Sequence, residues 1–102
     1  MQYTFTFLIT DTGEKFKVTY GFESDELALY YAYYLCNTDI TDHVPDDIEF
    51  IDYYEEESKA TGEEPSYDDL EVELNDINTV PQMGIQCIEI SRDGGIVIYI
   101  WR

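Results

Sequence analysis

Basic residues are scarce in this sequence. Its 102 residues include five Lys or Arg against 23 Asp or Glu, which gives a formal net charge of −18. A field of this sign repels the phosphates of nucleic acids and of anionic membranes, and it attracts basic protein surfaces. The composition therefore argues against direct binding of DNA, RNA or a membrane and favours a basic protein as partner.

Long apolar runs and cysteines are also few. No stretch approaches the roughly 20 apolar residues of a membrane span, and the start Met1–Thr4 lacks the basic residues of a signal peptide. We therefore expect a cytoplasmic protein. The two cysteines, Cys36 and Cys87, fall in segments with helix and strand patterns, and we expect both to be buried free thiols.

Motifs for catalysis and for metal binding are missing. The chain has no Gly-rich phosphate loop and no CxxC pair, and no nucleophile can be tied to its one histidine, His43. Residues 37–48 faintly follow the alternation of a calcium loop, but Asp42 stands where Gly is required and Ile48 where Glu is required. A row of exposed acids also lacks the contrast in environment that separates the pKa values of catalytic carboxylates. We expect no enzyme activity, no metal and no cofactor.

The residues that are abundant predict a folded chain. Hydrophobic residues make up 44% of the sequence, with ten Tyr and five Phe, and the length fits a single domain over 1–102. Alternating apolar residues on either side of the turn 11–14 predict a β-hairpin over about 2–22, and the Gly-rich turn 92–95 predicts a second over about 84–102. The run 96–101 has no polar face and favours a central strand covered on both sides.

Between the hairpins, the pattern changes to helical spacing. Ser24 followed by two acids predicts the start of a helix over 24–37, and this helix is apolar nearly all round, so either it is buried on two sides or its tyrosines reach an interface. Pro45 at a first helical position predicts an acidic helix over 46–60, with one apolar side formed by Ile48, Phe50, Ile51 and Tyr54. Residues 66–77 fit a short helix or an edge strand. The predicted fold is α+β, an antiparallel sheet from two hairpins with the helix 24–37 packed on it.

Negative charge is concentrated in the middle of the chain. Residues 39–76 hold sixteen acids and one base, Lys59, whereas the remaining residues hold seven acids and four bases. Acids on one side of the helix 46–60 would follow one another at about 5–6 Å along its axis, and a second acidic segment at 68–76 would supply another row. The predicted partner contacts are Asp46, Glu49, Asp52, Tyr53, Glu56 and Glu57 in the first row, and Asp68, Asp69, Glu71 and Glu73 in the second.

The segments DDIEFIDYYEEE (46–57) and EEPSYDDLEVELND (63–76) give the chain a resemblance to the small acidic DNA-mimic inhibitors of phages and mobile elements, of the anti-CRISPR or antirestriction type. The resemblance is one of size, charge and pattern, and covers about the middle third. It implies an inhibitor in the cytoplasm of a bacterial host that occupies the nucleic-acid channel of a defence nuclease such as a CRISPR effector or a restriction enzyme. Repulsion among the acids would then be relieved by Lys and Arg of that partner.

Other interpretations of the acidic segments stay open. The belt is alternatively a solubilising face, and the protein a structural or assembly module that docks through the Tyr-rich helix 24–37, with homo-oligomer formation left open. An acidic regulator of another basic protein would have the same sequence features. Salt separates these alternatives, because charge mimicry weakens at high ionic strength whereas a tyrosine interface persists.

Overall fold

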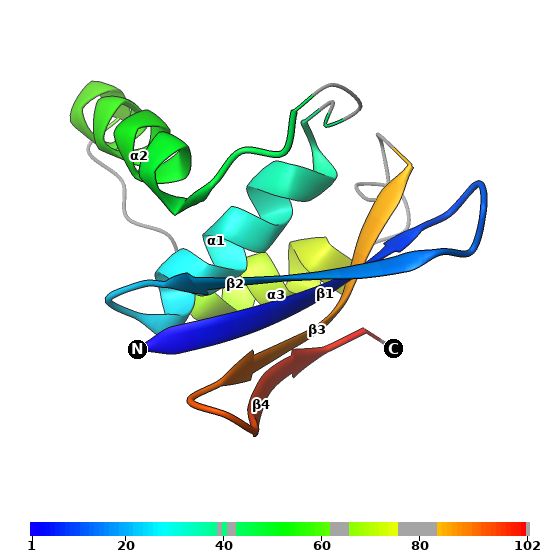
Figure 1. Ribbon diagram of the computed structural model, residues 1–102. Helices are drawn as coiled ribbons and strands as arrows, with labels where there is room; N and C mark the ends of the chain where they lie inside the picture. The colour runs from blue at the N-terminus through cyan, green and yellow to red at the C-terminus, as the bar shows by residue number, and fades with distance from the viewer. Residues whose placement is uncertain (39, 41–42, 62–65, 76–83, 102) are drawn as a thin grey trace.

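Three helices cover one face of a four-stranded antiparallel sheet (Figure 1). The computed structural model describes residues 1–38, 40, 43–61, 66–75 and 84–101, with the backbone alone at 59–61 and 67. Its elements are β1 (Gln2–Ile9), β2 (Lys15–Gly21), α1 (Asp25–Cys36), α2 (Asp47–Thr61), α3 (Tyr67–Asn75), β3 (Ile85–Arg92) and β4 (Ile96–Ile100). The predicted α+β class is confirmed, and so are both hairpins and the helices expected over 24–37 and 46–60.

The first hairpin contributes the central strand β1, which carries buried aromatic residues, and the edge strand β2. Gly13 lies in the turn at a φ of +76°, where an L side chain is strained, and its N–H donates to the carbonyl of Ile9 at 2.8 Å. Along β1, Tyr3, Phe5 and Phe7 are fully buried. The alternation of the strand therefore directs these three aromatic rings to the side that the helices cover.

The second hairpin joins the sheet through β3, and β4 lies at an edge. The strand order is β2-β1-β3-β4, and Ile96, Val97 and Ile100 are each 52% exposed, whereas Tyr99 is buried. The prediction of a central strand over 96–101 is wrong. An apolar, β-branched run favours a strand wherever it lies, and the position in the sheet is decided instead by which strand β1 pairs with.

Helix α1 packs on the sheet and is covered in turn by the other two helices. Ser24 caps its start by accepting the N–H of Leu27 at 3.3 Å, and α2 and α3 both contact it. Burial on several sides therefore explains its nearly uniform apolar character. Cys36 at its end and Cys87 on β3 are buried free thiols, as predicted.

A polar contact ties the start of α1 to the sheet. Asp25 accepts the hydroxyl of Tyr3 at 2.7 Å, and its two carboxylate oxygens lie 3.0 and 2.9 Å from Nη1 of Arg92. Asp25 thus joins side chains from β1 and β3 in one cluster. The first acid of the helix acts in folding, where the helix dipole also favours a negative charge.

The segment with mixed periodicity, 66–77, forms helix α3 over Tyr67–Asn75 rather than an edge strand. Leu70 and Leu74, four residues apart, are buried, whereas Val72 is 69% exposed. Gln86 of β3 is 2% exposed, and its Nε2 donates to the carbonyl of Leu74 at 3.0 Å. This bond holds the end of α3 against β3. Residues 76 and 77 lie outside the described part of the chain.

Candidate protein-binding surface

Helix α2 begins at Asp47, and Asp46 is its capping residue. The Oδ1 atom of Asp46 accepts the N–H of Glu49 at 2.9 Å. Pro45, expected at the first helical position, is buried just before this cap, and its carbonyl accepts the hydroxyl of Tyr31 at 2.7 Å. Asp46, a predicted partner contact, therefore has a local role in starting the helix.

Phe50 anchors α2 on the rest of the fold. Its side chain is fully buried, with ring centroids 5.5 Å from Tyr31 and 5.8 Å from Phe22. Ile48 was predicted to share this apolar side but is 69% exposed, because two steps along a helix turn a side chain by about 200°. The core side of α2 is therefore narrower than predicted, with Phe50 at its centre and Tyr54 beside it.

The carboxylates of α2 and α3 point largely to solvent. Asp52, Glu55, Glu56 and Glu57 of α2 and Asp68, Asp69 and Glu73 of α3 are exposed, and Glu71 is partly buried. Within the residues described, Glu49 pairs with His43, their Oε1 and Nε2 atoms being 2.6 Å apart. Asp52, Glu56 and Asp69 have no described basic side chain against them. The surface thus keeps a high density of unneutralised charge.

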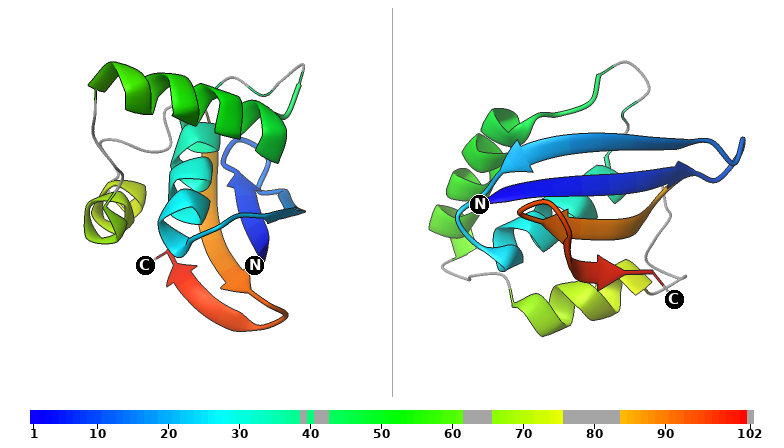
Figure 2. Two further views of the ribbon diagram at one scale, coloured as in Figure 1. Left: turned by 90° about the vertical axis from the view of Figure 1, so that its left-hand side faces the viewer. Right: turned by 60° about the horizontal axis from the view of Figure 1, so that its bottom comes forward.

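The two acidic rows lie on either side of α1. Figure 2 shows α2 and α3 flanking α1, with all three helices on the same side of the sheet. Both helices contact α1, which therefore lies between the two rows. The sequence did not determine whether the rows are adjacent, because the order of helices in space depends on tertiary packing.

Tyrosines occupy the space between the two rows. The rings of Tyr34 on α1 and Tyr53 on α2 stack at 4.7 Å, so Tyr53, predicted as an outward contact, is half-buried between helices. Burial, followed by the charge of Glu73 and a hydrogen bond with it, raises the pKa of Tyr33. Burial, together with the neighbouring Tyr53, raises the pKa of Tyr30 to about 12. These tyrosines connect the acidic helices.

Positive charge lies elsewhere on the molecule. Lys15 and Lys17 are exposed on β2 and alternate with Phe16, which packs toward the core. They therefore project from the face of the sheet that the helices leave uncovered. Arg92 is held by Asp25. Among the described residues, exposed acids are densest on α2 and α3, whereas these two lysines lie on the open sheet.

Comparison with protein-family models, with curated proteins and with solved structures finds no match to this chain. Within the described residues, no three His, Cys, Asp or Glu side chains gather as metal ligands. Asp39, Thr41 and Asp42, which belong to the loop compared above with a calcium site, lie outside the described part. No described helix is long and apolar enough to cross a membrane.

The structure changes which residues belong to the predicted contact surface. Asp46 caps a helix, Glu49 pairs with His43 and Tyr53 packs between helices. Glu55, which sequence reasoning left out, is exposed and lines a pocket. The signal for Glu55 was its spacing of four residues from Ile51, which lines the same pocket. The exposed acids that remain from the prediction are Asp52, Glu56, Glu57, Asp68, Asp69 and Glu73, with Glu71 partly buried.

Proposed function

We propose that this protein binds the positively charged nucleic-acid-binding surface of another protein, such as a nuclease of a bacterial defence system, and blocks that surface. The observation that supports this proposal is the set of exposed, unneutralised carboxylates on α2 and α3, two helices of the same layer. Sixteen of the 23 acids fall in residues 39–76 beside one base. Such a surface attracts Lys and Arg clusters, speeds association with them and repels nucleic acid itself.

Two acidic rows on one helical layer allow a basic channel of the partner to be contacted at two places (Figure 2). The tyrosines between the rows are partly exposed and would add apolar contact beside the acids.

The proposal gives the chain a passive, stoichiometric role. It acts in the cytoplasm of a bacterial host, carries no catalytic residue and needs no cofactor. Its contacts are exposed carboxylates, led by Asp52 and Glu56 on α2 and by Asp68 and Asp69 on α3. Because these groups are exposed, binding weakens steeply as salt screens them.

Affinity capture from bacterial lysate tests the proposal. The belt variant Asp52→Asn, Glu56→Gln, Asp69→Asn removes three exposed carboxylates from α2 and α3. We expect the unmodified protein to retain a nucleic-acid-binding protein that moderate salt releases, and the belt variant to lose it. The purified partner should then release labelled DNA or RNA when the unmodified protein is added at equal concentration.

A matched control separates the acidic belt from net charge. The variant Asp11→Asn, Glu14→Gln, Glu89→Gln removes the same number of charges from the two hairpins and should capture the partner normally. Equal capture by all three proteins would show that the belt is only a solvated face. Failure of the captured partner to release nucleic acid would reject the blocking role.

Assembly through an apolar contact is the second candidate, and β4 favours it. Helix α1, the predicted docking element, is largely covered by α2 and α3. By contrast, Ile96, Val97 and Ile100 are each 52% exposed at the open edge of the sheet, where a further strand could pair. Sedimentation of the unmodified protein and of Val97→Lys at low and high salt tests this candidate. A complex that forms at high salt and disappears with the lysine would support it.

A further inference from the structure

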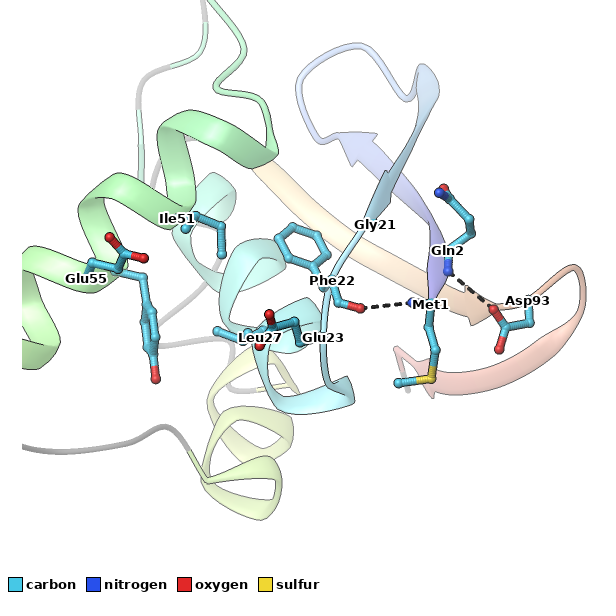
Figure 3. Close-up of a pocket in the computed structure, with 10 residues that line it drawn as sticks. Met1, Gln2, Gly21, Phe22, Glu23, Leu27, Ile51, Glu55 and Asp93 are labelled. Atoms are coloured by element: carbon cyan, nitrogen blue, oxygen red, sulfur yellow. Dashed lines mark hydrogen bonds between the residues drawn. The ribbon is translucent and has the colours of Figure 1, made fainter.

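A pocket of about 590 Å³ opens where α2 passes the start of α1 and the end of β2 (Figure 3). This volume lies within the range of about 300–1,000 Å³ that is usual for ligand sites. Figure 3 shows Ile51 and Glu55 reaching into it from α2, Leu27 from the first turn of α1, and Phe22 from the segment that leads into α1. The pocket therefore adjoins the α2 part of the acidic surface.

The floor of the pocket is apolar. Phe22 is 5% exposed, and Leu27, Ile51 and Tyr54 are partly buried against the core cluster. A ligand that enters far enough to cover these side chains gains from removing apolar surface from water, at roughly 25 cal/mol per Å². The occupant therefore needs an apolar part several atoms long.

Carboxylates surround this apolar floor. Asp93 is already engaged, since it accepts the N–H of Gln2 at 3.2 Å. Glu23 and Glu55 are exposed, and within the described residues neither has a hydrogen-bond or ion-pair partner. Among the described residues that line the pocket, the amino group of Met1 is the only cation, and it donates to the carbonyl of Phe22 at 3.2 Å. Two carboxylates are thus available to a cationic ligand.

We propose that this pocket binds an arginine or lysine side chain of the basic partner, with the backbone on either side of it. The aliphatic stem lies along Phe22, Leu27 and Ile51, and the cationic head reaches Glu23 and Glu55. Long basic side chains combine an apolar stem and a charged head in this way, and charge-assisted hydrogen bonds to a carboxylate are among the stronger ones. This inference rests on the function proposed above, because it names the chemistry that anchors the partner.

Titration with a short peptide tests the pocket without the unidentified partner. The probe is acetyl-Gly-Arg-Gly-amide, and the same peptide with citrulline in place of arginine is its uncharged control. In ¹H–¹⁵N spectra of the full chain, the arginine peptide should shift the amides of Gly21, Phe22 and Ile51 first. The double variant Glu23→Gln, Glu55→Gln should weaken binding by about 4- to 25-fold, at two- to fivefold for each exposed charge contact.

Glu14→Gln is the matched variant, because it removes an exposed charge outside both the pocket lining and the acidic rows and should leave the peptide affinity within about twofold. Equal shifts with the citrulline peptide, shifts spread evenly over α2 and α3, or no shifts at 20 mM peptide (about −2 kcal/mol of binding at most) would each overturn the pocket assignment.

The two proposals fail separately. Partner capture that depends on Asp52 and Glu56 but not on Glu23 and Glu55 would reject the pocket and keep the belt. Peptide binding in the pocket without any captured partner would reject the belt and keep the pocket.

Discussion

Replacement of Phe50 by Ala should detach the acidic helix α2 while leaving the sheet intact. The ring of Phe50 is fully buried, and its centroid lies 5.5–6.2 Å from five other aromatic rings. Truncation of such a side chain costs about 3–5 kcal/mol. The other apolar residues on this side of α2, Ile51, Tyr53 and Tyr54, are only partly buried. The loss therefore falls mainly on the docking of α2.

Amide hydrogen exchange measures this loss element by element. In Phe50→Ala, the amides of α2 should exchange at least about 100-fold faster, which corresponds to roughly 3 kcal/mol, while those of β1 and β3 keep most of their protection. Ile48→Ala is the matched control on the same helix, since Ile48 is 69% exposed and its truncation should stay within about 0.5 kcal/mol. Unchanged protection of α2 in Phe50→Ala, or an equal effect of the two variants, would refute the anchoring role of Phe50.

Three further predictions concern pH, the contact between α1 and the sheet, and salt. Burial raises the pKa of Tyr30 to about 12. The stability that the neutral Tyr30 contributes is therefore complete below pH 10 and is lost as the pH rises toward 12. The variant Tyr30→Phe should lose less stability at alkaline pH, as measured by unfolding followed by circular dichroism. Tyr3→Phe removes the 2.7 Å hydrogen bond to Asp25 and should cost about 1–2 kcal/mol in urea unfolding. Salt screens repulsion between helical neighbours such as Asp52 and Glu56, at a few tenths of a kcal/mol per pair. Raising NaCl from about 10 mM, where the Debye length is about 30 Å, to 0.5 M should therefore raise the free energy of unfolding by about 1–2 kcal/mol, and no change would contradict it.

Local sequence patterns were enough to locate the two hairpins and the helices α1 and α2. The alternation around Phe5, the capping Ser24 and the turn at Gly13 each depend on a few neighbouring residues, and the structure agrees with them to within one or two residues. The sequence also predicts the acidic helix, because Pro45 and two acids precede apolar residues at helical spacing. Short-range chemistry of this kind acts in the same way whatever the rest of the chain does.

Relations between elements were harder to predict. The run 96–101 has a strand composition, but its place at the edge follows from the pairing of β1 with β3. Leu70, Val72 and Leu74 fit a strand, and Leu70 and Leu74 also fit a helix; packing against α1 and the bond from Gln86 favour the helix. The same holds for the acidic rows, whose separation by α1 depends on helix packing that no local pattern contains.

The placement of charge separates folding from binding in this chain. The described core is aromatic and apolar. Truncation of Phe50, which holds α2 in place, costs about 3–5 kcal/mol, whereas each repulsive pair of acids costs only a few tenths of a kcal/mol. The fold can therefore carry the exposed acids Asp52, Glu56 and Asp69, which do not tie elements together as Asp25 does or cap a helix as Asp46 does. The belt variant Asp52→Asn, Glu56→Gln, Asp69→Asn should accordingly be as stable as the unmodified chain or more so, and yet bind a basic partner less well. Loss of stability together with binding would instead mean that these carboxylates act through the fold.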